Sequence, residues 1–572
     1  MKSSFGVLGW LRDYRRGDLS HDLVASFSLV IFLVPQGLAY AMLAGLAPQA
    51  GLYASILPVI GYALVGSSAA LSVGPAALPS LMTTAVLATV AGLTPLMLPV
   101  LAAALALWSG LLRVALGALR FGFIANFLSS SVVGGFVTGS ALLIVLTQLP
   151  ILLGIDSHEP DARSILLHAW DARGTVGWAT PLVSLLTLAA LHVCRKRGVA
   201  ALGAIGIRGT PAELAARAAP LLVILLAASL VAFAHLPVHV VGTLPAGLPP
   251  FSWPHVELQT LQSLLPAIGA IALIGFIDSY SIAQTLALKR RETVNPNREL
   301  IALGLANVAA GVSGGFPVSA SFSRSAANEL AGARTQLAGV LAAVWMLLIL
   351  AGATGLFAYL PLAALSAIIV MAVMQLIDFS MLRLAWRYER ADALIFAATA
   401  AAVLLAGVVT AVVLGVLLSL ALFVWRTSQP HLAELGRVPG SEHYRNRLRY
   451  EVEMCPGVLA VRVDESLYFA NIRFVCDEVV GLLHERPDAA SVLLVLSAVN
   501  AIDVSALQGL RELRRGLAEQ GVALHLAEVK GPVLDRLKQS GFLEELGDDA
   551  LHLSTHVAIQ YLRETSADNY VI

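Results

Sequence analysis

The stretch GGFPVSASFSRSAANELAG, residues 314 to 332, decides the fold, because it carries a single arginine, Arg324, between two long apolar runs. A cation at bilayer depth costs from about 2.5 to more than 10 kcal/mol, so one that persists faces a polar cavity or a partner. Arg324 therefore indicates a bound anion. The alternative is that Arg324 reaches an interface or ties helices together through backbone carbonyls.

The residues around Arg324 predict a chain break followed by a short helix. Gly314, Gly315 and Pro317 interrupt the preceding run, and the segment SASFSRSAANEL is expected to be helical. The serines available as N-caps are Ser319, Ser321 and Ser323. A helix that begins inside the membrane directs unpaired N–H groups and the positive end of its dipole into the protein, which favours an anion.

The composition is that of a polytopic membrane protein. Of 572 residues, 58% are hydrophobic and 13% are charged, and the mean hydropathy is +0.79. The 37 basic and 37 acidic residues balance, which gives no reason to expect a nucleic-acid partner. The three cysteines, Cys194, Cys455 and Cys476, are too scattered for a disulfide framework or a metal site, and no cofactor is expected.

Fourteen apolar runs are expected to form membrane segments between residues 21 and 426, since a helix needs about 20 apolar residues to cross a bilayer. Two of the runs, near residues 81 and 324, are short and rich in Gly, Pro and Ser. The predicted centres are residues 30, 58, 81, 104, 134, 184, 226, 272, 306, 324, 344, 368, 399 and 416.

The basic residues predict the orientation of these segments. Twenty Lys and Arg residues fall in segments expected inside and two, Arg163 and Arg173, in segments expected outside. The N-terminal segment, residues 1–20, has no apolar core and cleavage site of the signal-peptide kind. We therefore expect both termini in the cytosol and a protein of the cell (inner) membrane. In this count only Arg324 belongs to neither side.

The last part of the chain is expected to be a soluble α/β domain. Residues 427–446 read as a polar linker, residues 447–565 as the domain and residues 566–572 as a tail. The predicted strands are VLAVRV, SLYFA, SVLLVLSAV and VALHLAEV, and the predicted helices include VSALQGLRELRRGLAEQG and PVLDRLKQSGFLEELG. No phosphate-binding glycine motif or His/Cys cluster is present, so a regulatory or structural role is expected.

A counterpart to the Arg324 stretch lies in the first half of the chain. SSAALSVGPAALPSLMTTA, residues 67 to 85, is also short and is broken at Gly74 and Pro75. Two interrupted segments at corresponding positions predict a transporter of two inverted repeats, here about residues 21–235 and 260–426, with its site at the bilayer midplane. The alternative is a pair of ordinary Gly/Pro kinks in packed helices.

Three further polar residues are expected at depth. Asp278, in GFIDSYSIAQ, carries a carboxyl group that can exchange a proton near neutral pH if it is removed from water. A permanent ion pair, with Arg324 as the partner, is the alternative. In VPQGLAYA, Gln36 offers an amide and Tyr40 an aromatic wall for an oxyanion cavity, although both residues also suit helix packing.

These stretches together resemble the SulP family of anion transporters, which end in a cytosolic STAS domain. VPQGLAYA, LSVGP, GFIDSYSIAQ and PVSASFSRSAAN follow the order and spacing of the family, and the likeness runs from about residue 17 to 565. The resemblance implies fourteen segments in two inverted repeats of seven, a core domain that moves against a gate domain, and a homodimer. It also implies an anion site between the starts of half-helices 3 and 10.

Carried over position by position, the resemblance assigns the site. The implied anion-binding residues are Gln36, Tyr40, Pro75, Ala76, Ser323 and Arg324. Asp278 stands where proton-coupled members usually carry Glu, and sodium-coupled bicarbonate relatives also use an acid at this position. The motif SFSRSAAN is most similar to the corresponding segment of the sulfate/proton symporters.

In the C-terminal domain, SAVNAIDVSALQGL resembles the strand-to-helix loop of STAS domains. The resemblance implies that Asp503 and Ser505 lie in this loop, where soluble bacterial STAS proteins have a phosphorylated serine. The commonest physical use of a serine here is to cap the helix, and we expect Ser505 to do so.

The predicted function is import of sulfate, or a similar small oxyanion, together with protons. Sodium-coupled uptake of bicarbonate, or dicarboxylate transport, is the alternative on the same scaffold. In a different class of function, the membrane part would be an anion-responsive sensor that signals through the soluble domain. An enzyme is the least expected reading, since no nucleophile with its base and no metal cluster is evident.

Overall fold

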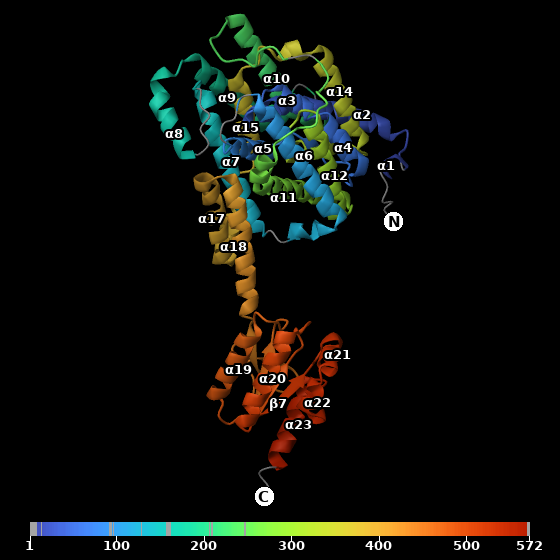
Figure 1. Cartoon of the computed structure of the whole chain (residues 1–572), viewed down its shortest axis with the longest axis vertical. Coiled ribbons are helices and arrows are strands. Elements are labelled where there is room, and N and C mark those ends of the chain that lie inside the picture. The colour runs from blue at the N-terminus through green and yellow to red at the C-terminus, as the bar shows by residue number, and fades with distance from the viewer. Residues whose placement is uncertain are drawn as a thin grey trace. The chain divides into compact units, whose positions relative to one another are not determined.

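The computed structural model describes residues 9–568 except 13, 91–93, 95, 127–128, 156–161, 205, 207–209 and 245–246. The chain divides into two compact units, with the boundary between Ser419 and Leu420. The first unit is helical apart from one pair of very short strands, and the second unit has a six-stranded sheet (Figure 1).

The α-helices of the first unit are α1 (Gly9–Arg12), α2 (Asp18–Leu43), α3 (Gln49–Tyr53), α4 (Leu57–Val65), α5 (Ala77–Leu87), α6 (Met97–Ala118), α7 (Ser130–Leu153), α8 (Ala162–Asp171), α9 (Ala179–Ala204), α10 (Thr210–Ala234), α11 (Leu258–Arg290), α12 (Pro296–Val312), α13 (Phe322–Leu330), α14 (Leu337–Gly352), α15 (Leu362–Val373), α16 (Ser380–Tyr388) and α17 (Arg390–Ala406). Helix α18 (Val408–Ser428) begins in the first unit and contains the boundary. Short 3₁₀ turns are η1 (Phe121–Asn126), η2 (Ala172–Thr175) and η3 (Thr354–Phe357).

Each of the fourteen predicted centres lies within one of these helices. Of the helices in the described part of the chain, five are long and apolar enough to cross a membrane by themselves, namely α2, α6, α7, α11 and α18. The two weak runs form α5, of 11 residues, and α13, of 9 residues, which are too short to span a bilayer alone. The number of crossings therefore stays a prediction.

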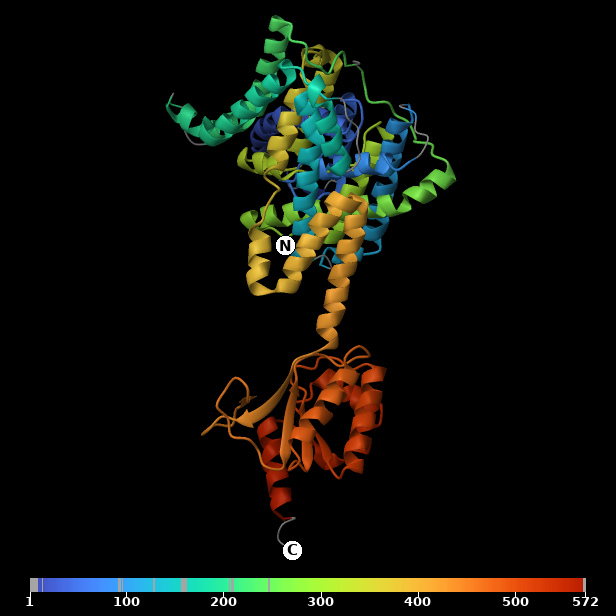
Figure 2. The same cartoon turned by 90° about the vertical axis from the view of Figure 1, so that its left-hand side faces the viewer.

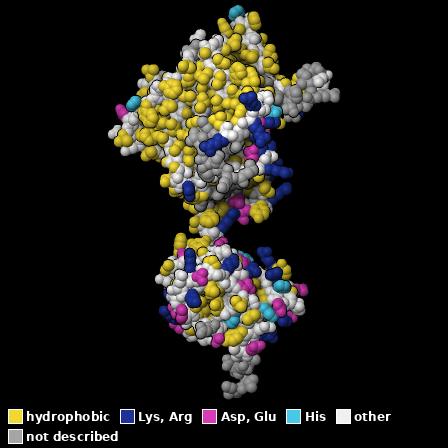
Figure 3. Space-filling view, turned by 90° about the vertical axis from the view of Figure 1, so that its right-hand side faces the viewer, with side chains coloured by type: hydrophobic (Ala, Val, Ile, Leu, Met, Phe, Trp, Pro, Cys, Tyr) yellow, Lys and Arg dark blue, Asp and Glu magenta, His cyan; other side chains and the backbone are white. Residues whose placement is uncertain are grey.

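The surface of the first unit is largely apolar. On the face shown in Figure 3, hydrophobic side chains cover most of this unit and charged side chains gather along an edge. Leu226 and Phe233 on α10 are 69% and 87% exposed, and Leu185 on α9 is 66% exposed. Such a continuous apolar exterior is stable only against lipid or another apolar surface.

The helices of the first unit pack in two groups. In the first, α12 packs against α4 and α6, α14 packs against α2, and α11 packs against α6. In the second, α17 and α15 pack against α7, and α9 packs against α10 and α15. We call these the α12 group and the α7 group. Both groups combine helices that are far apart in the sequence, as the mixed colours of the first unit in Figures 1 and 2 show.

Glycines allow the backbones within the α7 group to approach closely. A Cβ atom at Gly135 would lie 2.4 Å from the carbonyl oxygen of Phe396 on α17, and one at Gly139 would lie 2.8 Å from that of Ala400. Small residues at such contacts let helices in a membrane gain packing that lipid cannot replace. The α7 and α17 helices are therefore expected to move as one body.

Gly135→Ala is expected to destabilise the first unit, because the new methyl group must displace the backbone of α17. Overpacking of this kind costs about 1 to 3 kcal/mol, so the melting temperature in detergent should fall by several degrees. The matched control is Gly269→Ala on α11, where nothing lies within 4 Å of the new atom and the variant should melt at or above the wild-type temperature. Equal melting of both variants would contradict the tight contact.

The two predicted chain breaks meet in space. Strand β1 (Val73–Gly74) pairs with the antiparallel strand β2 (Ser319–Ala320), with Val73 opposite Ala320 and Gly74 opposite Ser319. Helix α5 begins shortly after β1, and α13 begins shortly after β2. The pairing of β1 with β2 therefore brings together the starts of two short helices that are about 250 residues apart in the sequence.

The second unit is a sheet with helices on both faces. Its strands are β3 (Leu432–Arg437), β4 (Tyr444–Asn446), β5 (Val458–Val463), β6 (Ser491–Val495), β7 (Ala523–Ala527) and β8 (Leu551–His552), in the order β4-β3-β5-β6-β7-β8. Strands β5 to β8 are parallel, and β3 is antiparallel to both of its neighbours. The helices are α19 (Ile472–Glu485), α20 (Val504–Glu519), α21 (Gly531–Gln539), α22 (Phe542–Leu546) and α23 (Thr555–Asp568), with the 3₁₀ turn η4 (Asp548–Ala550).

Three expectations for the second unit differ from the structure. Residues 427–446, expected as a linker, contain β3 and β4. The sequence of β3 looks polar because it includes Glu434, which is buried in the strand between Arg447 and Arg486. The segment SLYFA is not a strand and forms only one bridge, from Leu467 to Ile502. The last predicted helix is broken into α21 and α22 at Gly541, whose φ is +72°.

Candidate functional site

Arg324 is fully buried on α13, and its side chain extends across the β1–β2 strand pair. Its Nη1 atom donates to the carbonyl oxygen of Pro75 at 2.6 Å and to Oε1 of Gln36 at 3.0 Å, and its Nε atom donates to Oγ of Ser72 at 3.4 Å. These partners come from α2 and from the segment between α4 and α5. The structure thus places Arg324 next to Gln36 and Pro75, two of the residues expected with it at the anion site, and the binding role itself stays a prediction.

The Nη2 atom of Arg324 is buried and has no hydrogen-bond partner among the residues that the structure describes. A Cβ atom at Gly74 would lie 3.5 Å from Nη2, so any side chain at position 74 would be in contact with this atom. A buried cationic donor without a partner is costly, since desolvation is not repaid by a hydrogen bond. This is the arrangement expected of a group that binds an anion.

Both short helices begin at this place without a side-chain cap. Ala76 precedes α5 and Ser321 precedes α13, and neither side chain bonds to the first turn of its helix. The three serines that we expected as caps are used differently: Ser321 Oγ lies 3.2 Å from Ser323 Oγ, and Ser319 donates to the carbonyl of Ala320. The free N–H groups of two helix starts add positive potential to that of Arg324.

Gln36 and Tyr40 lie one helical turn apart on α2, after the kink residue Pro35, and both are buried. The oxygen of Gln36 accepts from Arg324, and the use of its NH₂ group as a donor toward an oxyanion stays a prediction. Tyr40 lies close enough to Arg324 for the two groups to interact electrostatically. The amide nitrogen and the aromatic ring thus border the space beside the arginine.

The scaffold of the site contains buried polar residues that sequence reasoning missed. Ser325 Oγ accepts from the N–H of Ser72, Asn328 donates to the carbonyls of Ala69 and Ala70, and Asn307 forms two bonds with the backbone of Val318. The signal for one of them was present, because Asn328 follows Arg324 by four residues and so lies on the same face of α13. These side chains satisfy the broken backbone where no regular helix can.

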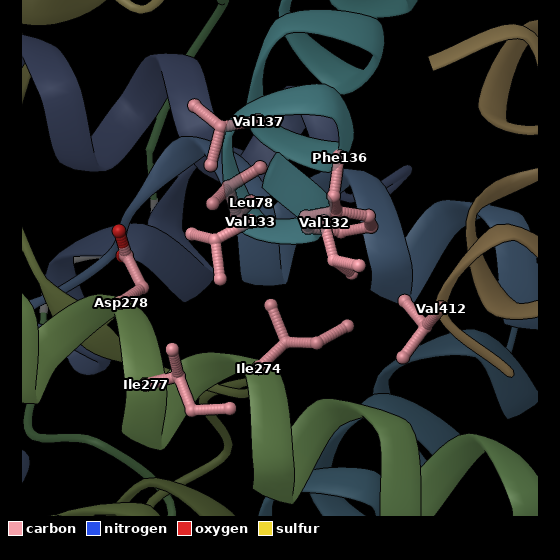
Figure 4. Close-up of a pocket in the computed structure, with 9 residues that line it drawn as sticks. All are labelled: Leu78, Val132, Val133, Phe136, Val137, Ile274, Ile277, Asp278 and Val412. Atoms are coloured by element: carbon pink, nitrogen blue, oxygen red, sulfur yellow. The ribbon is translucent and has the colours of Figure 1, made fainter. Parts of the chain in front are cut away.

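Asp278 lies on α11 and lines a pocket (Figure 4). The other residues that line it are apolar: Leu78, Val132, Val133, Phe136, Val137, Ile274, Ile277 and Val412. They come from α5 and α11 on one side and from α7 and α18 on the other. Asp278 is therefore the acid at a pocket where the α12 group faces the α7 group.

Asp278 is joined to the strand crossing through its neighbours. Its carboxyl group lies within hydrogen-bonding reach of Ser319 in β2, and the adjacent Ser279 accepts from the N–H of Ala320 at 2.9 Å. Asp278 and Arg324, both of them described residues, form no ion pair. The alternative of a permanent pair between these two residues is therefore wrong, since Arg324 is held by neutral oxygen atoms instead.

A second buried arginine was assigned wrongly. Arg113, counted with an inside loop, lies within α6 and is fully buried, and it donates to the carbonyls of Ile271 and Ala272 on α11. A Cβ atom at Gly275 would lie 2.3 Å from its Nη2 atom, so the guanidinium group rests on a glycine. Arg113 thus does what the alternative for Arg324 proposed, because it ties two helices together through carbonyls.

The loop before α20 also differs from expectation. Asp503, not Ser505, is the N-cap, and its carboxylate accepts from the N–H groups of Ala506 at 2.8 Å and Phe469 at 2.9 Å. Ser505 is the second residue of the helix and its side chain is exposed. The prediction that Ser505 caps the helix is wrong, because the aspartate two positions earlier already fills that place.

A buried guanidinium group at two uncapped helix starts, set in an apolar helical unit that precedes a soluble α/β unit, defines an integral membrane transporter for anions. The sequence comparisons assign its family: residues 19–399 match the sulfate permease family and residues 449–558 match the STAS domain. The chain belongs to the sulfate permease family, SulP/SLC26, with a C-terminal STAS domain. It is therefore a transporter and not an enzyme, and no group of three or more metal-ligating side chains occurs among the residues that the structure describes.

Several relatives match nearly the whole chain. A probable sulfate transporter of Mycobacterium tuberculosis is 35% identical over 558 residues, which cover 96% of this chain and 97% of the relative. Sulfate transporter 4.1, chloroplastic, of Arabidopsis thaliana is 33% identical over 589 residues, which cover 99% of this chain and 84% of the relative.

Solved structures show the same fold. The murine Solute Carrier 26 family member A9 anion transporter in the inward-facing state has a TM-score of 0.87 at 22% identity and covers 97% of this chain and 93% of its own. The transmembrane domain of a cyanobacterium bicarbonate transporter, BicA, has a TM-score of 0.59 at 24% identity and covers 71% of this chain and 98% of its own. At these identities the likeness concerns the fold alone.

Arg324→Ala is expected to weaken anion binding by at least 100-fold while the protein still folds, because a charge-assisted bond and its electrostatic field are both lost. Binding is measured by calorimetry with sulfate in detergent. The control is Arg290→Ala, which breaks the ion pair with Glu329 near the other end of α13 and leaves the helix start intact. Unchanged affinity in the folded Arg324 variant would make this arginine structural.

Proposed function

We propose that the protein imports sulfate, or a similar small oxyanion, with protons. The observation that carries this proposal is the buried Nη2 atom of Arg324, which lies where two uncapped helices begin and has no partner in the part of the chain that the structure describes. A tetrahedral oxyanion accepts from a guanidinium group and from backbone N–H groups at once. The relatives described as sulfate transporters support the choice of anion.

In this proposal the anion is bound by residues from three segments. Arg324 and Ser323 contact it from α13, Pro75 and Ala76 border it at the start of α5, and Gln36 and Tyr40 close the space from α2. The amide nitrogen of Gln36 donates, because its oxygen is already bonded to Arg324. The positive charge lies at bilayer depth, so the anion reduces the cost of burying it.

Transport follows from relative movement of the two helix groups. The α12 group would act as the core domain that carries the anion, and the α7 group as the gate domain. The fourteen predicted segments form two inverted repeats in this scheme, and both termini lie on the cytosolic side of the cell (inner) membrane in a homodimer. The pocket between α5, α11, α7 and α18 is the boundary at which the two groups would part.

Asp278 is proposed to carry the proton. It lies at the pocket rather than in an ion pair, so a proton that enters the pocket can reach it, and its charge is not already neutralised by Arg324. Protonation of Asp278 removes one negative charge from the neighbourhood of the entering anion. Binding of anion and proton would then favour each other, which is what symport requires.

The test is uptake by reconstituted vesicles with pH and sodium gradients set independently. Sulfate accumulation driven by an inward proton gradient in sodium-free buffer is expected. Uptake that requires sodium would favour sodium coupling over proton coupling. Flux of bicarbonate or dicarboxylate without sulfate flux would favour the alternative substrates. Anion binding without any flux would favour a sensor that signals through the STAS domain.

Asp278→Asn is expected to abolish accumulation driven by the proton gradient, to below about a tenth of wild type, while sulfate/sulfate exchange continues. The amide cannot take up a proton but has nearly the shape of the acid. The control Asp278→Glu keeps the titrating group and should retain coupling. Intact accumulation in Asp278→Asn would remove the residue from the proton pathway.

A further inference from the structure

Helix α16 carries two arginines at the surface of the first unit. Arg383 and Arg387 are four residues apart, so they lie on one face of the helix, and both side chains are exposed. A third exposed arginine, Arg390, begins α17. Among the described residues, Asp378 lies close enough to Arg383 for the two charges to interact, and both guanidinium groups of α16 remain exposed.

The exposed side of α16 also has large apolar and aromatic residues. Leu384 is 62% exposed, Trp386 is 58% exposed and Tyr388 is 89% exposed. In water these side chains would be costly to expose together, whereas at a bilayer interface aromatic rings lie at the level of the headgroups. Leu384 and Tyr388, four residues apart, lie on one flank of the arginines, and Trp386 lies on the other flank. Arginines flanked by apolar side chains are typical of a helix that lies in the interface plane.

The opposite side of α16 is fixed to the protein. Ala385 is buried, and Met381 packs near Gly134 of α7. The carboxylate of Asp378 accepts from the N–H of Ser380 at 2.7 Å and so holds the start of the helix, while the carbonyl of Asp378 accepts from Thr138 of α7 at 3.4 Å. Figure 2 shows α16 at the edge of the first unit, joined to α17 by a tight bend. The arginines are therefore presented on a rigid element.

We propose that α16 binds the headgroup of an anionic phospholipid through Arg383 and Arg387. The phosphodiester accepts two parallel hydrogen bonds from a guanidinium group, and an anionic headgroup complements the excess of positive charge on this face. The acyl chains would lie against Leu384 and the rings of Trp386 and Tyr388. A zwitterionic lipid lacks the net charge and would bind more weakly.

The proposed lipid site is connected to the pocket at Asp278 through helix α7. Helix α16 is attached to α7 through Thr138 and Gly134, and the neighbouring residues Val133 and Val137 of α7 line the pocket at Asp278. A lipid that stabilises α16 therefore stabilises the α7 group against which the other helices would move. The binding itself does not depend on which anion is transported.

The test compares lipid retention by the full-length protein in detergent after reconstitution in equal amounts of phosphatidylglycerol and phosphatidylcholine. The wild type should retain phosphatidylglycerol in preference to phosphatidylcholine, as counted by native mass spectrometry. In the double variant Arg383→Gln/Arg387→Gln, the preference for phosphatidylglycerol should fall at least about fivefold. Each basic residue near an anionic surface changes the binding constant by a comparable factor. Both positions are exposed, so the fold should be kept.

The matched control is Arg195→Gln/Arg197→Gln, which removes the same charge from two exposed positions on α9. This variant should keep the wild-type preference, and so should Arg383→Lys/Arg387→Lys in large part. Added phosphatidylglycerol should raise the melting temperature of the wild type and the control but not that of the double glutamine variant. Inorganic phosphate at the same concentration should have no effect.

Three results would overturn the proposal. Retention of phosphatidylglycerol by the double glutamine variant at the wild-type level would place the lipid elsewhere. An equal loss in the α9 control would reduce the effect to net charge. Stabilisation by inorganic phosphate equal to that by the lipid would assign the arginines to a soluble anion instead.

Discussion

A guanidinium group that is fully removed from water lies where two interrupted helices cross, and the rest of the first unit holds it there. The cost of burying Arg324 is met by neutral oxygens from Gln36, Ser72 and Pro75, none of which cancels its charge. Because an acidic partner is absent among the described residues around it, the positive potential remains available. The two uncapped helix starts add to that potential rather than compete for it.

The strand crossing β1–β2 is needed because a broken helix exposes backbone groups that a bilayer cannot satisfy. Four backbone-directed side chains, those of Ser279, Asn307, Ser325 and Asn328, complete the hydrogen bonds that the breaks leave open. The same contacts connect α11, and with it Asp278, to the segment that carries Arg324. The acid and the base are thus joined through a rigid frame without forming a pair.

The two buried arginines illustrate how far a residue type can be interpreted. Arg324 and Arg113 are both fully buried, and both donate to backbone carbonyls. Arg113 is turned toward the backbone of α11 and rests on Gly275, so it joins two helices of one group. Each arginine has one buried guanidinium nitrogen without a partner in the described part of the chain, Nη1 in Arg113 and Nη2 in Arg324. Arg324 differs because it lies where two short helices begin, whereas Arg113 lies within α6.

Most of the membrane fold could be predicted, because apolar runs, chain breaks and their spacing are local properties. All fourteen predicted centres lie in helices, and the half-helices form where Gly and Pro interrupt the runs. The second unit was predicted less well at its edges: β3 was missed because Glu434 is buried by two arginines, and the cap of α20 was given to Ser505 instead of Asp503. Both errors concern polar groups whose partners are distant in sequence or compete for one position.

The sequence by itself determined the class of protein, the family motifs and the candidate residues Gln36, Pro75, Asp278 and Arg324. Only the tertiary structure decided how they are related: that the oxygen of Gln36 accepts from Arg324, that Asp278 faces a pocket and not Arg324, and that one nitrogen of Arg324 has no partner among the described residues. The physical reason is that hydrophobic periodicity and backbone breaks are encoded over short stretches of chain. Hydrogen-bond partnership depends instead on which distant segments the fold brings within about 3 Å of each other.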